Sequence, residues 1–241
     1  MVTNSISTAK SGTLFSGLGR MTSAEFLKLR KRTITKVLVL ILAGIISLIN
    51  LLLLAISKVN LPTGSGQGIS NIRELLGLSS GIPFALSLIA SFGVVLAIIL
   101  AASSMGSEYN WRTIRMALIS VESRFKFLTA KLISLGIMIL IGMVVGVVVG
   151  IIMSLITNAI GGYTFDFSFL TRSYLWQQFL QFWRTFYTIM PFALLGFTMS
   201  IVGRSAMPGI STGIGVGFLE SIITTFMRLA NGWIAKVPDY L

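Results

Sequence analysis

The stretch LISLGIMILIGMVVGVVVGIIMSLITN, residues 132–158, carries no charged side chain over its 27 residues. A helix rises 1.5 Å per residue, so about 20 apolar residues cross the hydrocarbon core of a bilayer. This stretch is therefore long enough to span a membrane with some tilt. A barrel strand would need short segments of alternating polarity, and this run is continuous. The stretch predicts a membrane-spanning helix.

Four further apolar runs have a similar length. They cover residues 37–57, 83–104, 185–203 and 207–227, and only the last contains a charge, at Glu220. Of the whole chain, 54% is hydrophobic and only 11% is charged. Because an uncharged run of 18 or more residues indicates a spanning helix, the sequence predicts an all-α polytopic membrane protein. Its five visible spans form one transmembrane domain over residues 37–228.

Basic residues are concentrated on one side of these spans. Thirteen of the 19 lie before the first span, between the second and third, or at Arg204. By the positive-inside rule, the N-terminus and the loop 105–131 are expected in the cytoplasm. The net charge of +12 then sets topology. No nucleic-acid partner is expected, because the cytoplasmic segments lack a basic groove with exposed aromatics.

The segments outside the spans are predicted from composition. The first 20 residues are polar and rich in Gly, Ser and Thr, so we expect a disordered cytoplasmic N-terminus. Residues 21–36 predict a short amphipathic helix on the membrane surface, or a simple basic segment that anchors the topology. Residues 229–241 predict an extracytoplasmic tail. The chain has no cysteine and no histidine, which excludes disulfides and zinc sites built from those residues. We expect no metal site.

Two spans carry glycine at every fourth position. Small residues at this spacing form a groove that lets another helix approach closely, within one subunit or at a moving interface between subunits. The six glycines expected in helix packing are Gly142, Gly146, Gly150, Gly209, Gly213 and Gly217. Glu220 is the only acidic residue within a predicted span. A carboxylate there is costly unless it is paired or faces water, so Glu220 is a candidate pathway residue or a structural hydrogen-bond partner.

The loop between the second and third spans, SEYNWRTIRMALIS at residues 107–120, has an apolar stripe. Trp111, Ile114, Leu118 and Val121 fall on one face of a helix, while Arg112, Thr113 and Met116 point elsewhere. A plain hairpin loop would need no such stripe. Periodicity alone leaves two readings open, a helix lying on the membrane or a helix docked into a cytoplasmic partner.

The residues of this loop also resemble a known family. The order Glu108-Tyr109-x-Trp111-x-Thr113-x-Arg115, then a Leu-rich turn, Ser120, Ser123-Arg124 and Lys131, is similar to the first cytoplasmic loop of the ABC-2 family. These proteins are the permeases of ATP-driven exporters. The upstream stretch AEFLKLRKRTITKVLVL, residues 24–40, is similar to the elbow helix of that family. With the span pattern, the resemblance covers roughly residues 20–230.

The resemblance implies a coupling helix that docks into a separate cytoplasmic ABC ATPase subunit. The residues expected to contact that subunit are Glu108, Tyr109, Trp111, Thr113, Ile114, Arg115 and Leu118. Arg124 and Lys131 would anchor the start of the third span. The family also implies a second permease copy or paralogue and six spans, so we expect a further helix beyond the five visible here.

Function is expected to be export of a lipid, peptide or hydrophobic drug across the plasma or inner membrane. The sequence has no G-x-x-x-x-G-K-[ST] phosphate loop, so ATP and magnesium would bind the partner ATPase and this chain would be non-catalytic. Two alternatives remain. One is a membrane-embedded structural or assembly subunit without transport, and the other is an ion-coupled transporter that uses Glu220.

Overall fold

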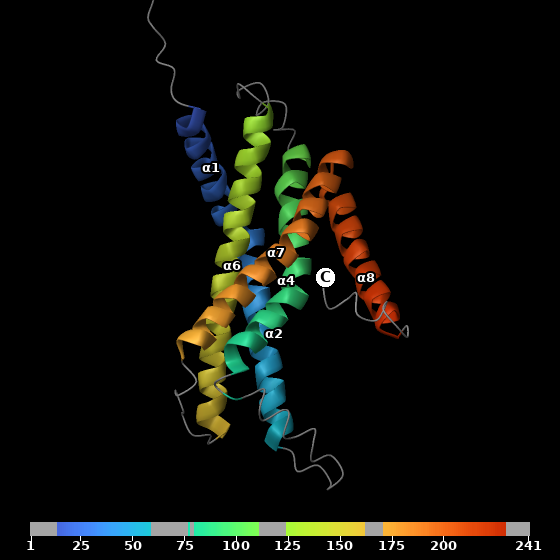
Figure 1. The fold of residues 1–241 in the computed structure, drawn as a ribbon. Coiled ribbons are helices and arrows are strands. Elements are labelled where there is room, and N and C mark those ends of the chain that lie inside the picture. Colours follow the sequence, from blue (N-terminus) through green and yellow to red (C-terminus); the bar gives the residue numbers. More distant parts are fainter. Residues whose placement is uncertain (1–13, 59–76, 78–79, 111–123, 162–170, 230–241) are drawn as a thin grey trace, which may run out of the picture.

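The computed structural model is built from helices. It describes residues 14–58, 77, 80–110, 124–161 and 171–229, and no strand occurs among them. The helices are α1 (Leu14–Lys31), α2 (Thr33–Lys58), α4 (Gly81–Asn110), α6 (Arg124–Gly161), α7 (Arg172–Val202) and α8 (Ala206–Leu229). Most of them run along the long axis of an elongated bundle, which α7 crosses obliquely (Figure 1).

Five of the helices are long and apolar enough to cross a membrane. These candidate spans are Thr33–Ile56, Gly81–Tyr109, Phe125–Ile160, Arg172–Val202 and Ala206–Met227. Even the shortest, at 22 residues, is about 33 Å long at the usual rise per residue. Each overlaps one of the five spans that the sequence predicts, to within one residue of containing it. The prediction of a helical, multi-pass membrane protein is confirmed.

Helix α4 lies at the centre of the bundle. It contacts α2, α6, α7 and α8, and the interface with α7 is the most extensive. Its buried side chains include Leu86, Ile89 and Ala101, which pack in one apolar core with Leu135 of α6 and Phe197 of α7. Lipid tails are as apolar as these side chains, so close van der Waals packing holds such helices together in a membrane.

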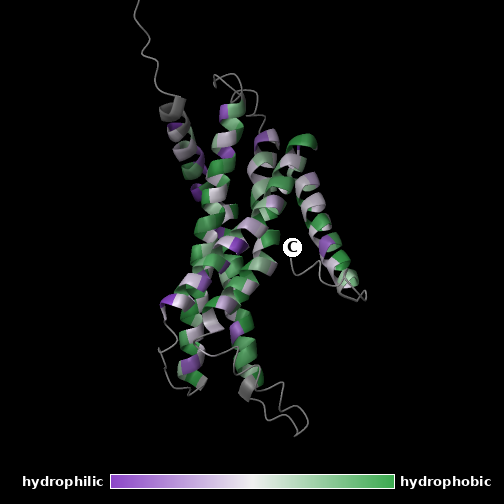
Figure 2. Ribbon diagram, in the orientation of Figure 1, coloured by the Kyte–Doolittle hydropathy of each residue, from purple (hydrophilic) through white to green (hydrophobic). Residues whose placement is uncertain are grey.

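The outward faces of the spans are apolar as well. Leu40 on α2, Val148 on α6 and Phe218 on α8 are exposed. Figure 2 shows hydrophobic residues along the outer sides of the spans as well as inside the bundle. A water-soluble protein rarely exposes such continuous apolar surface, whereas a bilayer requires it. The surface therefore agrees with the hydropathy of the sequence.

Helix α1 differs from the predicted N-terminal segment in its bounds. Residues 14–20, predicted to be disordered, form its first turns, and α1 ends at Lys31 instead of residue 36. The chain turns at Arg32, whose amide donates to the Leu29 carbonyl over 3.2 Å, and α2 starts at Thr33. Because α1 packs against α6 and contacts α2, tertiary packing extends it beyond what local composition indicates.

The turn between α7 and α8 is held by backbone hydrogen bonds. The Ser205 amide donates to the Ser200 carbonyl over 3.2 Å and the Arg204 amide to Ile201 over 3.3 Å, the pattern of a Schellman motif. Its left-handed position is normally glycine, but here Arg204 has φ 51°. A Cβ in that conformation costs roughly 1–2 kcal/mol.

Replacing Arg204 with glycine should therefore stabilise the protein by about 1 kcal/mol, because glycine adopts positive φ without strain. The measurement is thermal unfolding in detergent micelles. Arg204→Ala is the matched control, since it removes the same charge and keeps the strained Cβ. Equal shifts for the two variants would contradict the explanation from backbone strain.

Candidate functional site

Four charged side chains from three helices meet at the end of the bundle where α1 lies. They are Glu25 and Lys28 of α1, Glu108 of α4 and Lys131 of α6, here called the charge cluster. Lys28 Nζ lies 2.7 Å from Glu108 Oε1, and Lys131 Nζ contacts the same oxygen. Glu25 completes the cluster, with one oxygen 3.7 Å from Lys28 Nζ and the other 3.7 Å from Lys131 Nζ.

The centre of the charge cluster is fully buried. The side chains of Glu108 and Lys131 are 2% and 1% exposed, whereas that of Lys28 is 41% exposed. Removing an ion from water costs several kcal/mol, and pairing offsets this only with close geometry. The cluster holds two carboxylates and two ammonium groups, so its formal charges balance. Lys131 Nζ also lies 5.2 Å from the ring centroid of Phe127, within the range of a cation–π contact.

A second contact ties the same end of α4 to the turn between α1 and α2. The guanidinium of Arg32 donates to Ser107 Oγ over 2.7 Å and to the Ser104 carbonyl over 3.4 Å. Glu108 and Ser107 are adjacent on α4, so the last turns of this helix are bonded to both α1 and the α1–α2 turn. These contacts fix the position of α1 relative to the bundle.

The charge cluster lies at the two helix ends that flank residues 111–123. Glu108 is two residues before the end of α4 at Asn110, and Lys131 is in the second turn of α6, which starts at Arg124. Because these ends share an ion pair, they are linked to each other and to α1. The charge cluster therefore joins α1, α4 and α6 at this end of the bundle.

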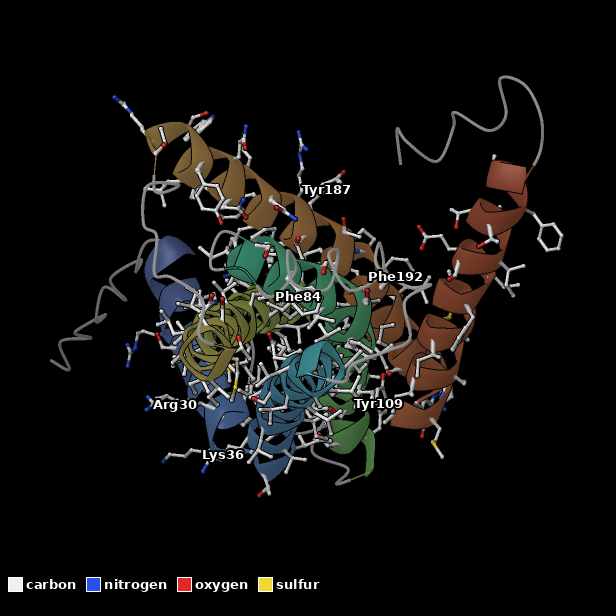
Figure 3. All side chains as sticks on the ribbon, turned by 90° about the horizontal axis from the view of Figure 1, so that it is seen from below. Arg30, Lys36, Phe84, Tyr109, Tyr187 and Phe192 are labelled. Atoms are coloured by element: carbon white, nitrogen blue, oxygen red, sulfur yellow. The ribbon has the colours of Figure 1, made fainter. Side chains whose placement is uncertain are left out.

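Most of the predicted coupling helix lies outside the described residues. This applies to Trp111, Thr113, Ile114, Arg115 and Leu118. Tyr109 is the last aromatic residue before that segment and packs, partly buried, against the apolar core (Figure 3). Arg124 is the first residue of α6.

Glu108 is buried at the centre of the charge cluster. Its side chain lies between two lysines of its own chain, and the contact with a separate ATPase that the resemblance implies stays a prediction. Glu108 is therefore an internal link. Lys131 was expected to anchor the start of the third span, and its contact with Glu108 gives it a buried partner there.

Glu25 and Lys28 were not identified from the sequence as members of a site. Judged from the neighbouring sequence alone, Glu25 is an acid in the first turn of a helix and Lys28 is a lysine on the helix surface. In the chain, 80 residues separate Lys28 from Glu108. The available signal was weak: Glu108 and Lys131 flank long apolar runs in a chain with only seven acidic residues. Such an acid needs a basic partner, but spacing along the sequence does not say which one.

The six glycines fall into two groups. An added Cβ at Gly146 would lie 2.9 Å from Ile89 Cδ1, and one at Gly213 would lie 2.6 Å from Ile98 Cγ2. At Gly150 it would overlap Ala85, and at Gly209 it would overlap Ser200 and the Gly196 carbonyl. These four glycines pack helices within the chain. The other two are Gly142, which has nothing within 4 Å, and Gly217, whose nearest atom is 3.9 Å away on Phe192.

Glu220 lies on an open groove between α4, α7 and α8. The volume of the groove is about 350 Å³. Phe92 and Val95 of α4, Phe192 of α7 and Phe218 of α8 form apolar parts of its wall. The N-terminal part of α8 packs against α4 and α7, and Figure 3 shows its C-terminal part diverging from the bundle. Helix α8 is also the least buried of the five candidate spans.

The described residues contain no group of three or more Asp, Glu, His or Cys side chains that could hold a metal ion.

The fold and the charge cluster define a multi-pass helical membrane protein whose central helices are joined by ion pairs at one end. Residues 71–238 match the family described as "Protein of unknown function (DUF2705)". The match covers well over half of the chain, which therefore belongs to this family. It includes Glu108, Lys131 and Glu220 but not α1. No curated protein and no solved structure matches.

Proposed function

We propose that this chain is the membrane-spanning subunit of an ATP-driven exporter. The supporting observation is the charge cluster, which joins the two helix ends flanking residues 111–123 to each other and to α1. A cytoplasmic ATPase that grips this segment would move α4 and α6 together. Without that link, the same force could move one of the two helices and leave the other in place.

The direction of force follows from the topology that we propose. The bias of basic residues assigns the α1 end of the bundle to the cytoplasm, where ATP is available. Helix α4 runs from this end through the centre of the bundle and forms one wall of the groove with α8. A tilt of α4 therefore changes the width of the groove. ATP binding by the partner must favour one of two packed arrangements for this to drive transport.

The test is co-purification of the full chain after mild solubilisation. The wild-type protein should retain a partner that contains a phosphate loop, identified by mass spectrometry. Trp111→Ala and Leu118→Asp should each reduce the retained partner at least about tenfold, the effect of losing 1.4 kcal/mol or more of binding free energy. Met116→Ala is the matched control, because Met116 lies off the apolar stripe.

The outcomes discriminate between the functions considered. Retention of the partner by all variants would remove the docking claim, and absence of any such partner from the wild type would support a non-transporting assembly subunit. Ion-coupled transport is favoured by the position of Glu220 on the groove. It predicts transport that stops when the ion gradient collapses and continues without cytoplasmic ATP.

A further inference from the structure

Three of the four polar side chains on the groove between α4, α7 and α8 offer only hydrogen-bond acceptors or a negative charge. Besides the Glu220 carboxylate, its lining includes the hydroxyls of Ser91, Thr188 and Ser221. Ser91 donates its proton to the Ser87 carbonyl over 3.1 Å, and Thr188 donates to Arg184 over 3.0 Å. These two hydroxyls therefore offer only lone pairs to the groove. A ligand that bonds to Glu220, Ser91 and Thr188 must therefore bring the donors.

The only charge on the groove is negative. No lysine or arginine is among the residues that line it, and among the described residues no ion pair involves Glu220. Glu220 is 14 residues from the start of α8, about 21 Å along the helix, which places it well inside the span. A carboxylate at that depth needs a cation or water beside it.

The remaining walls suit an apolar body. Phe92, Val95 and Ile98 come from α4, Phe192 from α7 and Phe218 from α8. The volume of about 350 Å³ is within the range of about 300–1,000 Å³ that is usual for small-molecule sites. The groove thus combines one anionic acceptor position with apolar walls.

We propose that this groove binds amphiphiles with a protonated amine, and that Glu220 selects the ammonium head. The N–H groups of a primary ammonium can donate to the carboxylate and to the lone pairs of Ser91 or Thr188. A quaternary ammonium or an alcohol would satisfy fewer of these acceptors. As a transport substrate class this rests on the proposed function, but binding itself does not require an ATPase.

The test is equilibrium binding of radiolabelled dodecylamine and dodecanol to the full chain in phosphatidylcholine nanodiscs. Dodecylamine should bind the wild type saturably. Glu220→Gln should weaken dodecylamine binding about tenfold, the loss of one charge-assisted contact, and leave dodecanol unchanged. Gly217→Leu should weaken both ligands because it fills the groove beside Phe192. Ser211→Ala is the control, since Ser211 is on α8 but does not line the groove.

Each other outcome identifies a different occupant. No saturable dodecylamine binding would assign the groove to phospholipid, and a chain that elutes as a dimer with Glu220 inaccessible to carbodiimide would assign it to a second copy. Equal losses of both ligands in Glu220→Gln would also overturn the selection by charge. Because co-purification of the ATPase is measured separately, binding without a partner would leave this inference standing and remove the export proposal.

Discussion

Glu108→Gln should destabilise the protein by about 3–5 kcal/mol, the usual cost of leaving one partner of a buried ion pair uncompensated. Glu108 Oε1 is the shared contact of Lys28 and Lys131. The substitution keeps the size of the side chain, so packing is preserved while the negative charge is lost. Among the described residues, the anion left beside Lys131, which is 1% exposed, would be the Glu25 carboxylate, 3.7 Å away. The measurement is thermal or denaturant unfolding in detergent micelles.

A double variant separates charge from shape. Glu108→Gln combined with Lys131→Met removes one charge of each sign and leaves the Glu25–Lys28 pair. It should therefore recover more than half of the lost stability, a coupling that is measured by the double-mutant cycle. Lys36→Met is the surface control, because Lys36 is exposed on α2 (Figure 3) and single surface charges contribute little. If the single and double variants unfold alike, the buried pair does not hold α4 to α6.

The membrane class and the number of visible spans were predictable because the hydropathy of a segment depends only on the residues within that segment. A run such as 132–158 has to leave water whatever it packs against. The bounds were less predictable. Helix α7 starts at Arg172, well before the predicted span 185–203, and α6 extends to both sides of residues 132–158. Helical turns that contain polar and aromatic residues extend these helices beyond the apolar runs. A hydropathy average does not detect such helical turns.

The charge cluster could not be predicted from the sequence, because its energy depends on distances between helices. Lys28 and Glu108 belong to segments whose positions are decided by the packing of α1 on α6 and of α4 on its neighbours. The glycine pattern was informative only in part. A spacing of four places Gly142, Gly146 and Gly150 on one face of α6, but only the packing shows that Gly142 has no neighbour within 4 Å.

The second large effect is expected at Gly209, where three helices meet. An added methyl group would overlap Ser200 Oγ and the Gly196 carbonyl of α7, and would lie 3.0 Å from Ala102 Cβ of α4. A backbone carbonyl cannot move without its helix. Gly209→Ala should therefore separate α8 from α7 and destabilise the protein by about 1–3 kcal/mol, the usual cost of overpacking.

Gly215→Ala is the matched control on the same helix. Nothing lies within 4 Å of an added Cβ at Gly215, so alanine there gains up to about 1 kcal/mol in helix propensity without a clash. Thermal unfolding in detergent micelles should thus shift in opposite directions for the two variants. Shifts of the same sign and size would mean that α8 is not seated against α4 and α7 at Gly209. The groove that carries Glu220 would then lose one of its walls, because α8 supplies the residues from Ile214 to Ser221 that line it.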